Sequence, residues 1–193
     1  MAEHEAELAG KVAIVTGGGA RGDGIGNGRA AALLMARAGA KVVVVDLDLD
    51  LARRTEAMIG QEGGVAMAVA GDVTSEASCR AIVEAAKAAY GGVDILDNNV
   101  GIGSRKSVVD EDLEYWDTVM RVNVQSMFLM SKYAIPSMVE RGGGAIVNIS
   151  SISALRPKGL TAYSASKGAV IALTRAMAVD HAKDGVRVNC VAP

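Results

Sequence analysis

The sequence predicts an α/β fold, namely a doubly wound, Rossmann-like parallel sheet with helices on both faces. Three observations support this fold class. Short apolar runs alternate with helical segments along the whole chain. The apolar runs are continuous rather than alternating, which is typical of strands buried on both faces. Glycine clusters follow several of these runs, which is typical of tight strand-to-helix turns. With 193 residues and no linker or internal repeat, the chain is expected to form a single dinucleotide-binding and catalytic domain, 1–193.

Six segments are expected to be strands, because they are short, rich in valine or alanine and bounded by glycine or polar residues. They are Lys11–Thr16, Lys41–Asp46, Val65–Ala70, Val93–Asp97, Ala145–Ser150 and Val186–Val191. The segments expected to be helices are Ile25–Ala38, Leu49–Ile59, Ser75–Tyr90, Leu113–Val139 and Ala162–His181. Ser75 is expected to be the N-cap of its helix, and Pro136 is expected to end or bend the long helix. The longest loop before the sixth strand is expected at Gly101–Glu111.

The sixth predicted strand ends close to Pro193, and no helical segment follows it. A doubly wound sheet normally continues beyond this point. We therefore expect the C-terminal part of the fold to be missing after the sixth strand.

Composition excludes several classes of protein. The net charge of −2 gives no electrostatic reason to expect binding to nucleic acid or to an acidic membrane. No apolar run reaches the roughly 18 residues of a membrane-spanning helix, and the acidic stretch Met1–Glu7 has no signal-peptide core. Cys79 and Cys190 lie far apart without metal-ligand spacing, so neither a metal site nor a disulfide framework is expected. The expected location is the cytoplasm.

A glycine-rich turn joins the first predicted strand to the first predicted helix. Seven of the 12 residues from 17 to 28 are glycine. Glycine lets backbone N–H groups approach a pyrophosphate, and the helix N-terminus adds a partial positive charge there. Gly26–Ala31 also fits a G-x-G-x-x-A pattern, so the register of the glycines stays open, and a flexible surface loop is the alternative to a binding turn.

Asp46 ends the second predicted strand, 20 residues after Gly26. A carboxylate at this place accepts hydrogen bonds from the ribose hydroxyls of an adenosine and would repel a 2′-phosphate. It therefore favours NAD over NADP, unless Asp46 only ends the strand. Arg21, inside the turn, is placed to reach a phosphate and weakens this preference.

Tyr163 and Lys167 are four residues apart at the start of a predicted helix, which puts them on one face and roughly 6 Å apart along the axis. A nearby ammonium stabilises a phenolate, so the pair can act as an acid/base near neutral pH. Ser150 and Ser151 end the fifth predicted strand, where a parallel sheet forms its ligand crevice. A hydroxyl there can bind a substrate carbonyl. The alternatives are an exposed helix pair and ordinary strand-ending serines.

Taken together, these motifs resemble the short-chain dehydrogenase/reductase family, in its compact single-domain branch. The matching segments are the turn Thr16–Gly26, Asp46, Gly71–Val73, Asn98–Gly101, Asn123, Ser151, Tyr163–Lys167 and Val188–Pro193. They follow one another in the expected order and span nearly the whole chain.

The resemblance implies a role for each matching residue. Tyr163 would be the acid/base, and Lys167 would bind the nicotinamide ribose and favour the phenolate of Tyr163. Ser151 would orient the substrate oxygen, and Asn123 would hold a water in the proton relay. The resemblance also implies which residues contact the cofactor. Gly17, Gly24, Ile25 and Gly26 would line the pyrophosphate, and Asp46, Asp72 and Val73 would contact the adenosine. Asn99, Val100 and Gly101 would lie on the adenosine side, and Tyr163, Lys167 and Pro193 complete the set.

The sequence departs from the family pattern in four places. Six residues separate Gly17 from Gly24, where the family has three, and Val100 replaces an alanine. The segment between Ser151 and Tyr163 is one residue shorter than usual, so Ser150 is an alternative to Ser151. The family also continues beyond the position of Pro193 with a nicotinamide-contacting loop, a substrate lid and a seventh strand.

The sequence thus predicts an NAD(P)-dependent oxidoreductase that moves a hydride between NAD(H) and an alcohol or carbonyl substrate, with NADP as the less favoured cofactor. One alternative is a catalytically silent dinucleotide-binding protein of the same fold, and another is a sugar-nucleotide epimerase or dehydratase, which shares the Y-x-x-x-K spacing. The resemblance also implies a homo-oligomer, a tetramer or dimer paired through 113–139 and 162–181, with a monomer as the alternative. The substrate itself is not indicated.

Overall fold

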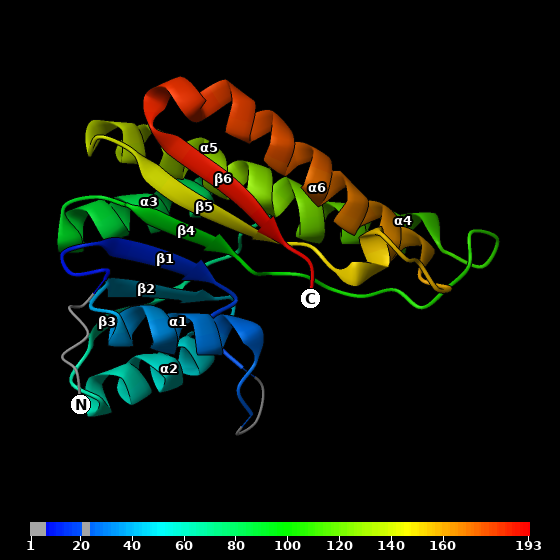
Figure 1. Ribbon diagram of the computed structural model, residues 1–193. Helices are drawn as coiled ribbons and strands as arrows, with labels where there is room; N and C mark the ends of the chain where they lie inside the picture. Colours follow the sequence, from blue (N-terminus) through cyan, green and yellow to red (C-terminus); the bar gives the residue numbers. More distant parts are fainter. Residues whose placement is uncertain (1–6, 21–23) are drawn as a thin grey trace.

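A six-stranded parallel sheet forms the centre of the protein, whose computed structural model describes residues 7–20 and 24–193 (Figure 1). The strands lie in the order β3-β2-β1-β4-β5-β6. They are β1 (Val12–Thr16), β2 (Lys41–Asp46), β3 (Val65–Ala70), β4 (Ile95–Asn98), β5 (Gly144–Ile149) and β6 (Val186–Val191). The order reverses between β1 and β4, which is the arrangement of doubly wound dinucleotide-binding sheets. The predicted fold class is confirmed.

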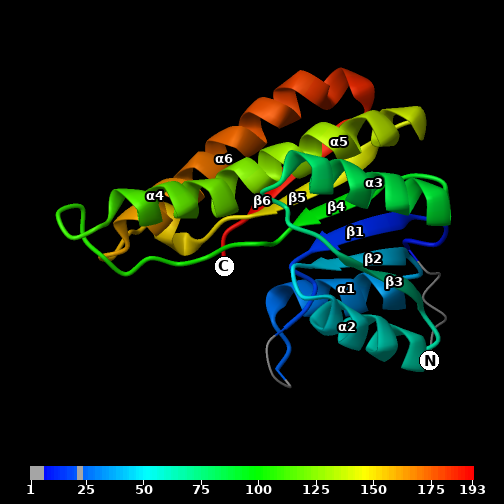
Figure 2. The ribbon, with the colours of Figure 1, turned by 180° about the vertical axis from the view of Figure 1, so that it is seen from behind.

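Helices cover both faces of this sheet (Figures 1 and 2). Helices α1 (Asn27–Arg37) and α2 (Leu49–Gln61) lie on one face. Helices α3 (Glu76–Tyr90), α4 (Leu113–Met120), α5 (Ser126–Glu140) and α6 (Thr161–His181) lie on the other. On the face of α1 and α2, these helices contact β1, β2 and β3, whereas alternate residues of β6 are exposed to solvent.

The continuous apolar pattern of the strands has a direct explanation in the core. Val42, Val43, Val44 and Val45 of β2 are all fully buried. Val43 and Val45 pack in the layer under α3 and α5, while Val42 and Val44 pack in the layer under α1 and α2. Because successive side chains of a strand point to opposite faces, a strand covered on both sides must be apolar at every position.

The predicted order of strands and helices is confirmed, with strand ends displaced by at most two residues. Ser75 is the N-cap of α3, where its hydroxyl oxygen accepts a hydrogen bond from the backbone N–H of Ser78 at 3.5 Å. The predicted loop Gly101–Glu111 lies between β4 and α4. None of the helices in the described part of the chain combines the length and apolarity that crossing a membrane requires.

The predicted single helix Leu113–Val139 is wrong in one respect that concerns the site. A π-helical turn, Arg121–Gln125, separates α4 from α5, and it contains Asn123. Such turns insert one extra residue into a helix and frequently occur at functional sites.

Pro136 lies inside α5 and does not end it, since the helix continues to Glu140. Pro136 is exposed, so water can bind the carbonyl that proline leaves without an N–H partner. The expectation that Pro136 ends the helix is therefore wrong, and the alternative that it bends the helix stays a prediction.

Candidate active site

Three adjoining pockets form one crevice along the carboxyl edge of the sheet, where a doubly wound fold binds its ligand. Their volumes are about 410, 360 and 380 Å³, and Asn99 lines all three. The first lies over the ends of β2 and β3, the second at the glycine-rich turn, and the third at the ends of β5 and β6. Sequence-predicted residues line each of them.

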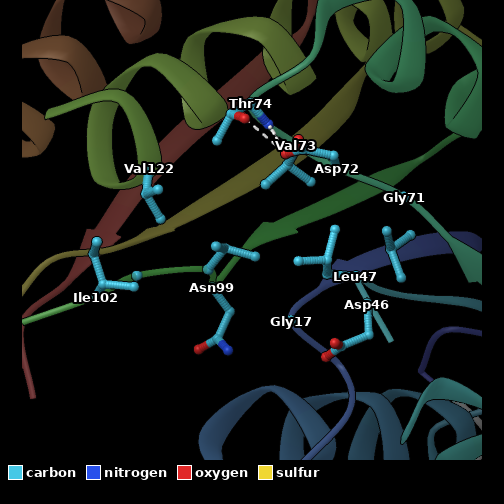
Figure 3. A pocket seen from close by; sticks show the side chains of 13 residues that line it. Gly17, Asp46, Leu47, Gly71, Asp72, Val73, Thr74, Asn99, Ile102 and Val122 are labelled. Carbon is cyan, nitrogen blue, oxygen red and sulfur yellow. Dashed lines mark hydrogen bonds between the residues drawn. The ribbon is translucent and has the colours of Figure 1, made fainter. Parts of the chain in front are cut away.

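The first pocket has an acidic wall (Figure 3). Asp46 at the end of β2 points toward Gly17, and its carboxylate accepts hydrogen bonds from the backbone N–H groups of Gly19 at 3.1 Å and Asp48 at 3.2 Å. Asp72 accepts from the backbone N–H of Thr74 at 2.8 Å. The predicted residues that meet in this pocket are Gly17, Asp46, Asp72, Val73, Asn99, Val100 and Gly101. Two carboxylates here would repel an additional phosphate.

The glycine-rich turn is held by close backbone contacts at two of its glycines. Gly17 has a positive φ of 65°, which favours glycine. A Cβ on Gly28 would lie only 2.1 Å from the carbonyl oxygen of Gly17, so α1 can approach the end of β1 only with glycine there. By contrast, a Cβ on Gly24 would meet nothing within 4 Å, and one on Gly26 would come no closer than 3.8 Å to a neighbour.

These contacts bear on the register that the sequence left open. Gly26 is the N-cap of α1 with a φ of −76°, a conformation open to any residue. Gly17 makes the tight turn, and Gly28 makes the close approach to it, whereas neither Gly24 nor Gly26 is required by packing. Since only the Gly26–Ala31 pattern includes Gly28, these contacts favour that register. Gly24, Ile25 and Gly26, which the resemblance places at the pyrophosphate, line the second pocket. Arg21 lies outside the described residues.

The third pocket collects the predicted catalytic side chains. Ser151, Tyr163, Lys167 and Pro193 all line it. The Nζ atom of Lys167 lies 5.6 Å from the centroid of the Tyr163 ring and donates a hydrogen bond to the carbonyl of Ile149 at 2.8 Å. Lys167 is 3% exposed, and this burial lowers its pKa to about 8. The four-residue spacing thus does place both groups at one pocket, as predicted.

The hydroxyls of Ser150 and Ser151 have different surroundings. Ser150 donates to the backbone carbonyl of Lys167 at 2.7 Å, so its proton is engaged within the protein. Ser151 accepts from the backbone N–H of Ser153 at 3.2 Å, and its contact with the carbonyl of Pro193 is long, at 3.5 Å. The hydroxyl proton of Ser151 is therefore the freer of the two, which favours Ser151 as the residue that meets a ligand.

Asn123 connects the loop after β4 to helix α6. It is fully buried in the π-helical turn. Its Oδ1 accepts from the backbone N–H of Ile102 at 2.8 Å, while its Nδ2 donates to the carbonyl of Ile102 and to the hydroxyl of Ser166, each at 2.9 Å. Ser166 in turn donates to the carbonyl of Tyr163 at 2.7 Å. Asn123 thereby fixes the main chain on both sides of the third pocket.

Gly101 keeps the space between these groups open. A Cβ there would lie 3.1 Å from the Nζ of Lys167 and 3.4 Å from the Oδ1 of Asn123. The contact with Lys167 would be tighter than most Cβ contacts, so glycine at this position leaves room beside the Nζ of Lys167.

Sequence reasoning did not single out Asn27, which lines the crevice, or Ser166, which lies behind it. Asn27, the first residue of α1, lines both the second and the third pocket. Ser166 joins Asn123 to the Tyr163 main chain. The available signal for Ser166 was its place between Tyr163 and Lys167, about one helical turn after Tyr163. Nothing in the sequence distinguished Asn27 from an ordinary helix-starting residue.

The sheet order, the glycine turn at the end of β1 and the acidic residue at the end of β2 define a Rossmann-type protein with a crevice suited to a dinucleotide. The sequence model of the short chain dehydrogenase family matches residues 11–193. The chain belongs to this family.

Individual relatives agree with this assignment. The chain is 45% identical over 144 residues to 2-(S)-hydroxypropyl-CoM dehydrogenase 3 of Xanthobacter autotrophicus, an alignment that covers 74% of this chain and 56% of the relative. It is 44% identical over 132 residues to a protein of the same organism named inactive 2-(S)-hydroxypropyl-CoM dehydrogenase 2, covering 68% of this chain and 57% of the relative. These alignments span little more than half the length of the two relatives.

A solved structure shows the same architecture. A crystal structure described as that of a short-chain dehydrogenase/reductase from Burkholderia xenovorans superimposes with a TM-score of 0.94 at 43% sequence identity. The match covers 97% of this chain and 75% of the other.

Proposed function

We propose that the protein is an oxidoreductase that transfers a hydride between NAD(H) and an alcohol or carbonyl substrate, with Tyr163 as the general acid/base. One observation carries the proposal. The pocket lined by Ser151, Tyr163 and Lys167 adjoins the pocket at the glycine-rich turn and the acidic pocket at Asp46, and Asn99 lines all three. The dehydrogenase named among the relatives supports an alcohol as the substrate class.

The residues present fit a dinucleotide. The glycine-rich turn leaves a cradle at the N-terminus of α1, where backbone N–H groups and the helix dipole favour a pyrophosphate. Asp46 is placed for the ribose hydroxyls of the adenosine, and Asp72 and Val73 line the wall beside it. Tyr163, Lys167 and Pro193 would border the nicotinamide end. The bound nicotinamide would supply the hydride acceptor or donor.

Tyr163 and Lys167 would share the proton chemistry. In the reducing direction, the phenol of Tyr163 donates its proton to the carbonyl oxygen as that oxygen gains negative charge, and in the oxidising direction the phenolate takes the proton back. The positive charge of Lys167, held beside the ring by its hydrogen bond to Ile149, stabilises the phenolate form. Burial strengthens this effect because it removes water that would screen the charge.

Ser151 and Asn123 would complete the site. The Ser151 hydroxyl donates a hydrogen bond to the substrate oxygen and holds it beside Tyr163. Asn123 is expected to position a water that exchanges protons with bulk solvent. Since both amide hydrogens of Asn123 are engaged by the protein, this water would donate to the second lone pair of Oδ1 or bind to the main chain of the π-helical turn.

The preference for NAD rests on Asp46, whose carboxylate lies in a pocket that also contains Asp72. A 2′-phosphate would face two negative charges there. We expect NADH to bind at least tenfold more tightly than NADPH. We also expect Asp46→Ser to reduce this ratio, which competitive fluorescence titrations would measure. Tighter binding of NADPH by the unaltered protein would contradict the assigned role of Asp46.

A homo-oligomer also belongs to this proposal. Leu113 on α4 is 76% exposed and Phe128 on α5 is 49% exposed, and both lie on the helices expected to pair between subunits. Light scattering on the purified protein would separate a dimer or tetramer from the alternative of a monomer.

The second candidate function is that of a catalytically silent protein of the same fold. The relative named inactive, at 44% identity, is the observation that favours it. The convergence of Ser151, Tyr163 and Lys167 on one pocket favours turnover instead.

NADH fluorescence titration followed by a screen of ketones and secondary alcohols separates the two. We expect saturable NADH binding and turnover of at least one substrate, and a Tyr163→Phe variant that binds NADH normally but turns over about 10²- to 10⁴-fold more slowly. If Tyr163→Phe turns over as fast as the unaltered protein, the mechanism is wrong. If NADH binds and no substrate turns over, the silent alternative holds.

A further inference from the structure

Arg29 is buried in an unusual place for an arginine. It is the third residue of α1, beside the glycine-rich turn, and only 3% of it is exposed. Arginine side chains are mostly exposed, and they become fully buried only when their donors are satisfied. The contacts of the Arg29 guanidinium therefore need an explanation.

The Arg29 guanidinium binds the turn at two points. Its Nη1 donates to the carbonyl oxygen of Gly24 at 2.8 Å, and its Nη2 donates to the carbonyl oxygen of Ala20 at 3.1 Å. These two carbonyls stand on either side of residues 21–23. A single planar group thus holds both sides of the turn at a fixed separation.

Thr55 of α2 extends the same arrangement. The Nε of Arg29 donates to the Thr55 hydroxyl at 3.0 Å, and that hydroxyl donates to the carbonyl oxygen of Gly18 at 2.8 Å. Thr55 is fully buried, so water does not compete for these bonds. Arg29 and Thr55 together hold the carbonyls of Gly18, Ala20 and Gly24.

The direction in which these carbonyls point matters for an anion. A peptide next to glycine can flip, because glycine adopts both signs of φ at little cost. A flipped peptide would present its carbonyl oxygen, rather than its N–H, to a phosphate. This turn has six residues between Gly17 and Gly24, where the family turn has three.

We propose that Arg29, with Thr55, is a positioning residue for the pyrophosphate of the dinucleotide: it binds the carbonyls of the glycine-rich turn from behind. Because the C=O and N–H of a trans peptide point in opposite directions, the carbonyl bond at Gly24 leaves the N–H of Ile25 for the ligand. The proposal rests on the proposed function in that it takes a dinucleotide as the ligand. The buried guanidinium also places a positive charge under the turn, which favours an anion there.

The chain offers a matched control for a purely structural role. Arg37, on the same helix, also ties α1 to the end of α2, through two hydrogen bonds to the carboxylate of Glu62 at 2.6 and 2.7 Å. It makes this contact at the surface and far along the helix from the turn. If Arg29 only joined α1 to α2, its loss and the loss of Arg37 would both change stability and leave NADH affinity alone.

The experiment compares four variants with the unaltered protein: Arg29→Lys, Thr55→Val, Thr55→Ser and Arg37→Met. NADH dissociation constants come from fluorescence titration, and melting temperatures are measured without ligand. Lysine keeps the charge of Arg29 but lacks its planar fork, and valine keeps the shape of Thr55 without its hydroxyl. Where a substrate turns over, the KM for NADH and kcat are measured as well.

We expect Arg29→Lys to raise the NADH dissociation constant at least tenfold and Thr55→Val to raise it at least threefold. Thr55→Ser and Arg37→Met should stay within twofold of the unaltered protein. The KM for NADH should rise in Arg29→Lys while kcat at saturating NADH stays within twofold.

A folded Arg29→Lys variant that binds NADH within twofold of the unaltered protein overturns this proposal alone. If Arg29→Lys fails to fold, Thr55→Val provides the test. A folded Thr55→Val variant that binds NADH normally then overturns this proposal. An unaltered protein that binds neither NADH nor NADPH overturns the proposed function first, and this inference with it.

Discussion

The glycine-rich turn and the third pocket, which we call the two ends of the crevice, are lined by different kinds of groups. The glycine-rich turn consists of backbone segments that approach one another closely. At Gly28, for example, a Cβ would strike the carbonyl oxygen of Gly17, so no side chain fits there. At the other end, functional side chains line the crevice, namely Ser151, Tyr163 and Lys167. The first end is suited to a ligand that is the same in every reaction, and the second to the chemistry itself.

This difference predicts which substitutions each end of the crevice tolerates. The turn is sensitive to added atoms, because its backbone must approach closely. Under the proposed function, the other end is sensitive to lost functional groups, because each one is assigned a separate role. Variants at the two ends should therefore separate binding from turnover.

The largest expected effect is on turnover and comes from Lys167→Met. Loss of the buried charge should slow turnover about 10²- to 10⁴-fold, because the phenolate of Tyr163 loses its stabilising neighbour. NADH affinity should fall far less. The exposed Lys183 provides the control, since Lys183→Met should leave both quantities unchanged. Turnover within tenfold of the unaltered protein would remove Lys167 from the proton chemistry.

The same variant should separate function from stability. Burial lowers the pKa of Lys167 to about 8, so the charged form is costly to the fold below that pH. The folded protein releases this proton above about pH 8, whereas the unfolded chain keeps it to about pH 10.4. Stability contributed by the neutral lysine therefore rises from pH 8 to pH 10. Denaturant unfolding at pH 7 and 9.5 should show the advantage of Lys167→Met over the unaltered protein shrinking at the higher pH.

The next largest effect should come from Gly28→Ala. A Cβ 2.1 Å from the carbonyl oxygen of Gly17 forces α1 and the turn apart, so the NADH dissociation constant should rise by more than tenfold, and the fold should lose about 1–3 kcal/mol. Gly60→Ala in α2 is the control, because its Cβ would meet nothing within 4 Å and Gly60 lines none of the three pockets of the crevice. Equal NADH binding by the two variants would show that close approach at Gly28 is not required.

The smallest effect should arise at Asp97 on β4, the strand that lies between β1 and β5. Asp97 is 3% exposed, and burial raises its pKa to about 7. The folded protein therefore keeps this proton between about pH 4 and pH 7 while the unfolded chain releases it, so stability falls with pH over that range and levels off above it.

Asp97→Asn removes this titration and should stabilise the protein by about 1–3 kcal/mol at pH 8, with little difference near pH 4. Urea unfolding between pH 4 and pH 8 would measure this difference in stability between Asp97→Asn and the unaltered protein. Asp180→Asn, at an exposed aspartate, is the control. NADH binding and turnover should not change. An Asp97→Asn advantage that does not vary with pH would contradict the assigned protonation.

The fold could be predicted almost completely from the sequence. The continuous apolar runs identified strands buried on both faces, because such strands have no polar side to alternate with. The exception was the segment from Leu113 to Val139, where the π-helical turn at Arg121–Gln125 was missed. A π-helical turn leaves the helical composition of a segment unchanged, so it has no signature in periodicity.

The candidate site was predicted in part. The spacing of Tyr163 and Lys167 follows from helix geometry alone, and the structure brings both to the third pocket. The choice between Ser150 and Ser151 could not be predicted, because it depends on which hydroxyl another element engages, here the carbonyl of Lys167. The requirement for glycine at position 28 rather than 24 or 26 likewise depends on a contact between α1 and the end of β1.

The sequence by itself determined the alternation of strands and helices, the family and the residue types at the crevice, because local composition and spacing carry that information. Only the tertiary structure decided that Arg29 turns inward to hold the carbonyls of Gly24 and Ala20. An arginine near the start of a helix has the same local pattern whether its side chain faces water or the turn. Its direction is set by Thr55, which lies 26 residues away in sequence and is brought beside it by the packing of α2.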